Sequence, residues 1–242
     1  MIKISVITAS YNRADLLADC IASVQRSKLT PLSNVAVEHI IYDDGSTDGT
    51  QLLMNSMSHD NLVFLTDPKN RGQSCARNRA IEKAQGDYLF ILDSDDILLE
   101  RALYQFSRLA LHQPTCAWFT SDFLRVDSTL RYLHGHDYYG WQFDSCSAML
   151  NSIFNGEHFL QGNTFFKREI FTQAGGYDDS LHMAEDLDLY IRFARAGHLP
   201  HHGNFISHLH RVHDRSISKH VTREKHLLDA SALAHKYSTS SV

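Results

Sequence analysis

The chain has 242 residues, of which 43% are hydrophobic and 21% charged, as expected for a globular protein with a sizeable core. This composition excludes disordered, collagen-like and coiled-coil chains. Its 23 Lys and Arg against 28 Asp and Glu give a formal net charge of −5. Proteins that coat nucleic acid are normally basic, so we expect no nucleic-acid partner. The four cysteines stand far apart without a CxxC pair, which indicates a reducing compartment.

No segment of the sequence reads as a membrane span or a secretory leader. A spanning helix needs about 20 consecutive apolar residues, whereas the strongly apolar stretches here, such as residues 88–92, have the length of strands. The N-terminus runs directly into the β-branched segment 2–7. We therefore expect a cytoplasmic protein without a transmembrane segment. Peripheral contact with the inner face of the membrane stays open.

The first half of the chain alternates short apolar strands with helical segments. In chain order we predict a strand over 2–8, a helix after Ala14, a strand over 35–42, a helix that Asp48 can cap, a strand over 61–66, a helix over 74–84 and a strand over 87–92. Short strands separated by helices of about ten residues predict an α/β fold. Its sheet should be mostly parallel, Rossmann-like and flanked by helices on both faces.

The second half of the chain is less regular. We predict strands over 116–123, 163–166 and 205–209, and helices around 168–173, 184–196 and 221–237. Residues 127–146 contain two glycines and many aromatic side chains, and they are expected to form a mobile loop.

Polar clusters follow three of the predicted strands: residues 8–12, residues 43–46 and residues 93–96. In open parallel sheets, ligands bind beyond the carboxyl ends of the strands, so these clusters should gather at one edge. Loops favour Asp, Ser and Asn in any case, so each cluster alone could be either an ordinary loop or part of a binding site. Because all three stand at strand ends and two are rich in acids, together they favour a binding site.

The cluster Asp93-Ser94-Asp95-Asp96 is the most acidic of the three. Carboxylates this close repel one another and attract a cation, and a hard divalent ion held by one or two carboxylates plus phosphates is typical of phosphate-handling sites. The alternative is that Asp95 or Asp96 merely caps the following helix. A calcium loop starting at Asp44 is excluded, because its twelfth position is Asn55 where such loops require Glu.

Six motifs, in order and at normal spacing, make the chain resemble family 2 glycosyltransferases of the GT-A fold. They are residues 5–13, residues 41–48, Asn70-Arg71-Gly72 with Ala76-Arg77-Asn78, residues 86–96, Gly175-Gly176-Tyr177-Asp178, and residues 185–189 with Arg192. The resemblance covers residues 1 to about 218. It implies one GT-A domain over 1–218, with a nucleotide-binding half (1–95) and an acceptor half (96–218), followed by a C-terminal helix and tail (219–242).

The resemblance implies a metal-dependent inverting transfer of one sugar from a nucleotide-diphosphate donor, expected to be a UDP-sugar, to a hydroxyl of a glycan or lipid-linked acceptor. Asp95 would bind Mn²⁺ or Mg²⁺, and Asp186 would be the general base. Residues 127–146 would help to shape the acceptor pocket. The family pattern places the donor among Thr8, Ala9, Tyr11, Arg13, Asp44, Gly72, Arg77, Asp93 and Ser94, with Asp44 at the nucleobase edge and Asp93 near the ribose.

The chemistry of sugar transfer accounts for these acids independently. A metal stabilises the charge that develops on a diphosphate leaving group, and a positioned carboxylate takes the proton of the acceptor hydroxyl. The alternative for Glu185-Asp186 is a favourable interaction with a helix N-terminus. Whether Glu185 shares the catalytic role stays open. The chain lacks a Gln-x-x-Arg-Trp motif, which argues against a processive polysaccharide synthase.

Histidine is abundant, with 16 residues, and concentrated late in the chain. His208, His210 and His213 have a spacing that could be read as a zinc site, since the first two share one face of a strand. The resemblance instead places His213, with Ser216 and Ser218, in a loop that closes over the diphosphate, and gives His213 a metal- or phosphate-contacting role. The local excess of Lys and Arg over 192–225 could face a diphosphate, a lipid-linked acceptor or an anionic membrane, or simply be solvated.

Two other classes of protein must be weighed. A metal-dependent nucleotidyltransferase also joins an α/β sheet to carboxylates, but it usually has a glycine-rich phosphate loop after the first strand, and residues 8–13 contain no glycine. A non-catalytic module that binds sugar nucleotides would be expected to have lost Asp95 or Asp186, and both are present.

Overall fold

The first half of the chain forms the parallel part of a sheet. The computed structural model describes residues 1–28, 34–57, 60–135, 140–158, 160–181, 183–216 and 223–238. The parallel strands are β1 (Ile2–Ser10), β2 (Val35–Asp44), β3 (Leu62–Asp67) and β4 (Tyr88–Ile91), and β1 lies between β2 and β4. They are joined by α1 (Ala14–Lys28), α2 (Thr50–Ser56) and α3 (Gln73–Glu82). This part confirms the predicted alternation of strands and helices.

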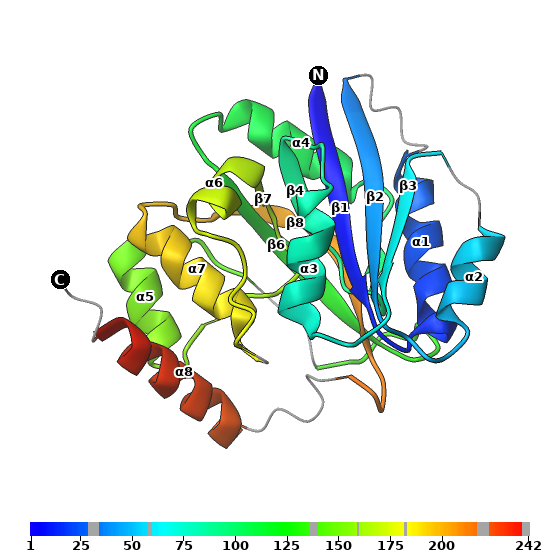
Figure 1. Cartoon of the computed structure of the whole chain (residues 1–242). Coiled ribbons are helices and arrows are strands. Elements are labelled where there is room, and N and C mark those ends of the chain that lie inside the picture. Colours follow the sequence, from blue (N-terminus) through cyan, green and yellow to red (C-terminus); the bar gives the residue numbers. More distant parts are fainter. Residues whose placement is uncertain are drawn as a thin grey trace.

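The second half of the chain extends the same sheet with mixed strand directions. Its strands are β5 (Ile97–Leu98), β6 (Trp118–Asp127), β7 (Phe165–Lys167) and β8 (His201–Val212). β6 and β8 run parallel, whereas β7 is antiparallel to β4 and β6, and β5 is antiparallel to β8. Over the described ranges the strand order is β3-β2-β1-β4-β7-β6-β8-β5. Each half of the chain therefore supplies one side of a single continuous sheet (Figure 1).

Helices cover both faces of the sheet, because the strands bury side chains on both sides. Ile4 and Val6 of β1 pack with α1 and α4 (Ala102–His112), and Ile7 on the opposite face packs with α3 and α7 (Glu185–Arg195). The second layer also contains α5 (Cys146–Phe154) and α6 (Arg168–Gln173), as Figure 1 shows. The fold is the expected α/β domain.

The C-terminal helix α8 (Arg223–Ser238) contacts α7 through the buried carboxylate of Asp188. Asp188 accepts hydrogen bonds from Lys236 Nζ at 2.6 Å and from Tyr237 Oη at 2.7 Å. Arg192, one turn further along α7, pairs with the other oxygen of Asp188 at 2.7 Å. A buried carboxylate must be paired, so this contact specifies where α8 lies.

Several local expectations need correction or adjustment. Asp95 and Asp96 do not cap the next helix, because β5 intervenes and α4 begins after Arg101. The N-cap of α2 is Gly49, although Asp48 still accepts the amide of Thr50 at 2.9 Å. The predicted loop begins where β6 ends, and four of its residues, 136–139, lie outside the described ranges. In the described part of the chain, the helices are too short or too polar to cross a membrane.

Candidate active site

A cleft of about 600 Å³ opens where the carboxyl ends of β1, β2 and β4 meet the start of α7. Most of the predicted site residues line it, namely Ala9, Tyr11, Arg13, Asp44, Gly72, Arg77, Asp93, Ser94, Asp95 and Asp186. Thr8 does not line the cleft: its side chain is buried in the sheet, with Oγ1 at 2.9 Å from His39 Nε2. A side chain at position 8 points to the opposite side of the strand from its neighbour Ala9, which explains the difference.

Asp44 holds one wall of the cleft by binding the backbone of the loop before α3. Its two carboxylate oxygens accept the amides of Arg71 at 2.9 Å and Gly72 at 2.8 Å. Burial raises the pKa of Asp44, while these two hydrogen bonds oppose the rise. Gly45 allows the close approach of the loop, since a Cβ there would lie 2.7 Å from the carbonyl carbon of Lys69.

Arg77 stands at the centre of the acidic part of the cleft. Its guanidinium donates to Asp93 Oδ1 at 2.7 Å and to Glu185 Oε1 at 2.8 Å, and it lies over the ring of Tyr177 at 5.5 Å from the centroid. Burial opposes the charge of Arg77, but the surrounding carboxylates outweigh it and raise its pKa. The arginine thus connects the end of β4 with the start of α7.

Asp95 and His213, both predicted to contact the metal or phosphate, lie side by side. Asp95 Oδ2 is 2.8 Å from His213 Nε2 and 3.8 Å from Arg13 Nε. Burial disfavours the charged form, but the hydrogen bond from His213 and the positive charge of Arg13 outweigh it, so the pKa of Asp95 lies below its ordinary value. An ionised carboxylate beside an imidazole nitrogen suits Mn²⁺ or Mg²⁺ as a partial ligand set, with phosphate oxygens and water completing the coordination.

Asn163 and Asp96 hold the turn of residues 93–96 in place by hydrogen bonds. No feature of the sequence marks Asn163 as part of the site. Asn163 Oδ1 accepts the amide of Asp93 at 3.1 Å, and its Nδ2 donates to Asp96 Oδ2 at 2.6 Å. The other oxygen of Asp96 accepts the amide of Arg211 at 2.9 Å. Asp96 is therefore a buried structural carboxylate. Asn163 carries no motif of its own, so only its place beside the turn reveals its role.

Asp186 sits in the first turn of α7, after a strained residue. Ala184 adopts a left-handed conformation with φ 57°, which turns the chain sharply into the helix. Asp186 Oδ1 accepts the amide of Leu187 at 2.8 Å, and its Oδ2 lies 3.5 Å from the point where Gly162 would carry a Cβ. Burial, helped by the charge of Glu185, raises the pKa of Asp186 to about 7. A carboxylate tuned near neutrality can accept a proton at working pH.

The three late histidines have three different environments. His208 is fully buried, stacks on Phe123 at 5.2 Å between centroids, and has a pKa lowered to about 3 by burial. His210 lines the cleft near Asp96, and His213 binds Asp95. Among the described residues, no three His, Cys, Asp or Glu side chains converge on one metal position. The zinc reading of this cluster therefore has no support.

The turn after β8 closes one end of the cleft against the first loop. Arg13 Nη2 donates to the carbonyl of Arg215 at 2.8 Å, and Arg215 Nη1 donates to the carbonyl of Asn12 at 3.2 Å. Ser216 lines the cleft and its Oγ accepts the amide of His213 at 3.0 Å. Ser218, also predicted in this loop, lies outside the described residues.

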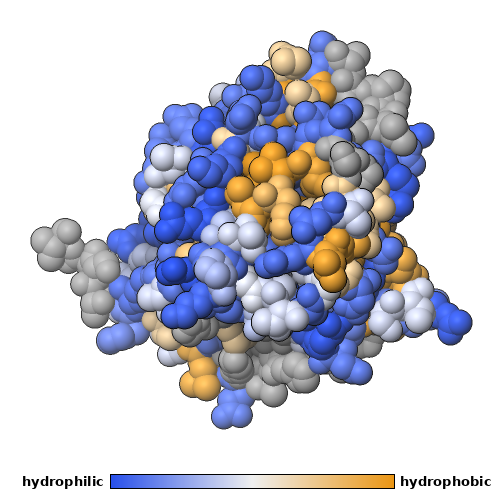
Figure 2. Space-filling view, turned by 45° about the vertical axis from the view of Figure 1, so that its right-hand side comes forward, coloured by the Kyte–Doolittle hydropathy of each residue, from blue (hydrophilic) through white to orange (hydrophobic). Residues whose placement is uncertain are grey.

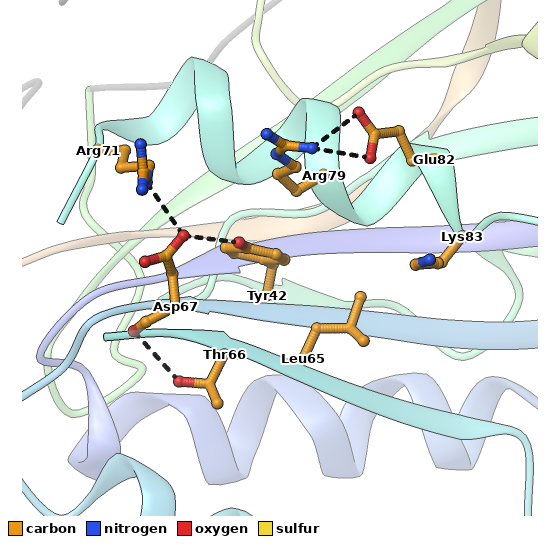
Figure 3. A pocket seen from close by; sticks show the side chains of 8 residues that line it. All are labelled: Tyr42, Leu65, Thr66, Asp67, Arg71, Arg79, Glu82 and Lys83. Atoms are coloured by element: carbon orange, nitrogen blue, oxygen red, sulfur yellow. Dashed lines mark hydrogen bonds and ion pairs between the residues drawn. The ribbon is translucent and has the colours of Figure 1, made fainter. Parts of the chain in front are cut away.

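A second, shallower hollow of about 350 Å³ lies between α3 and the edge strand β3 (Figure 3). Its acids are already occupied: Asp67 accepts from Arg71 Nε at 3.1 Å and from Tyr42 Oη at 3.3 Å, and Glu82 pairs with Arg79. Figure 2, which brings the β3 side forward, shows an apolar patch bordered by polar residues. These features lack the carboxylate arrangement of the main cleft, so the chemistry belongs to the main cleft.

Known proteins resemble the chain in both sequence and fold. TuaG of Bacillus subtilis, a glycosyltransferase provisionally assigned to teichuronic acid biosynthesis, is 41% identical over 97 residues, 38% of this chain and 36% of TuaG. The GalNAc(5)-diNAcBac-PP-undecaprenol beta-1,3-glucosyltransferase of Campylobacter jejuni is 33% identical over 106 residues, 43% of this chain and 33% of that protein. The matches thus span about a third of these relatives.

The fold matches the crystal structure of Staphylococcus aureus TarS 1–349 in complex with UDP-GlcNAc. The TM-score is 0.72 at 16% identity, and the match covers 94% of this chain and 64% of that one. The family model described as "Glycosyl transferase family 2" matches residues 5–175, which include most of β1, all of β2 to β4 and the cleft residues from Ala9 to Asp95. The chain therefore belongs to glycosyl transferase family 2.

Proposed function

We propose that this protein is a metal-dependent inverting glycosyltransferase. It moves one sugar from a UDP-sugar to a hydroxyl group of a glycan or a lipid-linked acceptor. The observation that carries the proposal is one cleft containing two differently tuned carboxylates. Asp95 has a lowered pKa and an imidazole partner, whereas Asp186 has a pKa raised to about 7.

Asp95 and Asp186 suit opposite tasks in an inverting displacement. Asp95 stays ionised and, with His213, would hold Mn²⁺ or Mg²⁺, which when bound supplies positive charge to the diphosphate leaving group. Asp186, near neutrality, accepts the proton of the acceptor hydroxyl as that oxygen attacks the anomeric carbon. The two carboxylates come from different elements, the turn after β4 and the start of α7. This suits an inverting displacement, in which the leaving group departs from the face opposite the attacking oxygen.

The donor side of the cleft suits a nucleoside diphosphate. The loop that Asp44 binds lines the cleft together with Tyr11, which is 43% exposed and can stack on a base. Arg13 lies near Asp95, where a diphosphate would meet its charge. TarS, which has the same fold, was crystallised with UDP-GlcNAc, and this supports UDP as the nucleotide.

The acceptor class is proposed from the relatives. The Campylobacter jejuni relative is named for an acceptor carried on PP-undecaprenol, and TuaG for teichuronic acid biosynthesis. Both names describe glycan assembly, one of them on a lipid carrier. We therefore propose a growing glycan or lipid-linked saccharide as acceptor, with the nucleotide half over 1–95 and the acceptor half over 96–218.

The proposal is tested by incubating the protein with UDP-glucose, UDP-galactose, UDP-GlcNAc and UDP-GalNAc, with and without Mn²⁺ or Mg²⁺. Mass spectrometry then follows UDP release and transfer to synthetic polyprenyl-diphosphate saccharides. We expect metal-dependent UDP release from one donor that disappears in Asp95→Ala. Donor binding without turnover would identify a binding module, and diphosphate release from UTP with a sugar 1-phosphate would identify a nucleotidyltransferase.

A further inference from the structure

The guanidinium of Arg77 is engaged within the protein, which makes it poorly placed to bind the nucleotide sugar. Its side chain is 3% exposed, and its two terminal nitrogens are already bound to Asp93 and Glu185. Turning a nitrogen away from Glu185, whose side chain is 12% exposed, would leave that carboxylate without its charge partner. The family resemblance implies that Arg77 contacts the nucleotide sugar, and these ion pairs favour a different role.

The ion pair with Arg77 distinguishes two adjacent acids that have the same charge. Glu185 is held at 2.8 Å by the guanidinium, so its charge is compensated and its orientation fixed. Asp186 forms no ion pair within the described part of the chain and keeps one oxygen near Gly162, facing the cleft. Only one of the two acids is therefore left available to accept a proton.

The same guanidinium connects the start of α7, where Asp186 lies, with the end of β4, where we propose that the sugar donor binds. Asp93, its other partner, follows β4 two residues before Asp95, while Glu185 begins α7 beside Asp186. Arg77 belongs to α3, and its guanidinium carbon lies over the ring of Tyr177, 5.5 Å from the centroid. A planar fork bound to two carboxylates fixes distance and angle together, which a lysine cannot do.

We propose that Arg77 is a positioning residue: by binding Glu185 and Asp93 at once, it makes Asp186 the base and sets that base relative to the donor. The inference rests on the proposed function and deepens it. It also answers whether Glu185 shares the catalytic role: because Glu185 is paired with Arg77, it does not act as the base.

Electrostatics adds a measurable consequence. Asp186 faces Glu185 and Tyr190 on its own helix, Arg77 on α3, Asp93 after β4, and Tyr177 before α7. Arg77 is the positive charge in this set and lowers the pKa of Asp186, while burial, Glu185 and Asp93 raise it. Removing the charge of Arg77 should therefore move the ionisation of Asp186 to higher pH.

The test compares Arg77→Lys and Arg77→Gln with the wild type. UDP release from the donor found active is measured from pH 5.5 to 9, and UDP affinity is measured separately by calorimetry. We expect kcat to fall about 10- to 100-fold in both variants, since a misplaced catalytic group costs about that much. The acidic limb of the pH–rate profile should shift to higher pH in Arg77→Gln and by a smaller amount in Arg77→Lys. UDP affinity should change by less than about fivefold in both variants.

Arg79→Gln is the matched control. Arg79 lies on the same helix, is exposed, and pairs with Glu82 outside the main cleft, so its loss should leave kcat and the pH profile unchanged. Normal kcat and an unchanged pH profile in folded Arg77→Lys overturn the inference. A large loss of UDP affinity with normal kcat overturns it too, since Arg77 would then be a donor ligand. If Arg77→Gln does not fold, Arg77→Lys decides.

A second measurement separates this inference from the proposed function. Aspartate carboxyl carbons are labelled and titrated by NMR, and the signal of Asp186 is assigned by its absence in Asp186→Asn. A higher pKa of Asp186 in the Arg77 variants supports the positioning role even if no donor is turned over. An inactive wild type with that shift would contradict the glycosyltransferase proposal alone, and an unchanged pKa would contradict the role of Arg77.

Discussion

Asp186 lines the cleft and has a pKa raised to about 7, and these two properties define its expected behaviour as a base. Asp186→Asn keeps the size of the side chain but cannot accept a proton. Sugar transfer should fall by roughly 10² to 10⁴, the usual contribution of a positioned general base. Donor affinity should hardly change, because the lost interaction belongs to the transition state. Steady-state kinetics with separate calorimetry of UDP binding measures both.

Glu185→Gln is the matched control for that experiment. The amide keeps a hydrogen-bond acceptor for Arg77 but loses the charge, so the loss of kcat should be smaller than in Asp186→Asn. Full activity of Asp186→Asn together with an inactive Glu185→Gln would reverse the assignment of the two acids.

The rate of transfer should depend on pH through the same residue. The pKa of Asp186 is raised to about 7, and a base works only when deprotonated. The rate should therefore reach half its plateau near the pKa and fall about tenfold for each pH unit further down. A pH–rate profile checks this, and the residual activity of Asp186→Asn should lack the acidic limb.

Asp95 is expected to couple metal binding to nucleotide binding. One carboxylate and one imidazole leave most coordination positions to phosphate and water, so the ion should bind well only with UDP. Titrating Mn²⁺ with and without UDP should show strong mutual enhancement in the wild type and little in Asp95→Ala. If both proteins bind UDP with equal metal dependence, Asp95 is not the ligand.

At the scale of elements, the contact between the end of β2 and the loop before α3 shapes the wall of the cleft where we propose that the nucleotide binds. Gly45 has φ +74°, and a Cβ there would lie 2.8 Å from the amide nitrogen of Asn70. Gly45→Ala should push the loop away from Asp44, weaken UDP binding, and cost about 1–3 kcal/mol of unfolding free energy. Thermal unfolding and calorimetry measure the two effects.

Gly197→Ala provides the control for this substitution. Gly197 also has a positive φ, +86°, but nothing lies within 4 Å of its added Cβ, and it follows α7 outside the cleft. Its replacement should cost only the backbone strain, about 1–2 kcal/mol, and leave UDP affinity unchanged. Equal UDP affinities in both variants would contradict the role given to the loop.

At the scale of the whole molecule, the two halves share one sheet and should unfold together. β4 of the first half pairs with β7 of the second, and both layers of helices span this junction. Both tryptophans, Trp118 and Trp141, lie in the second half. Urea unfolding followed by tryptophan fluorescence and by circular dichroism should therefore give coincident midpoints. Separate midpoints would indicate that residues 1–95 and 96–218 are independent units.

The sequence alone determined the α/β class, the parallel first half and most of the cleft. These features depend on local patterns: apolar strands, helices between them, and acids placed directly after strand ends, which a parallel sheet must gather at one edge. The resemblance of its motifs to a known family selected Asp95, His213 and Asp186 as candidate site residues, and Asp95 and Asp186 line the cleft. Here the information lies within a few neighbouring residues.

Only the tertiary structure decided how these residues are connected. Tertiary packing buries the side chain of Thr8 in the sheet, buries His208 against Phe123, and places Asn163 beside the turn of residues 93–96. It also bound Arg77 to partners that are 16 and 108 positions away along the chain. The physical reason is that burial and ion pairing depend on which distant segments pack together. No local pattern encodes that packing.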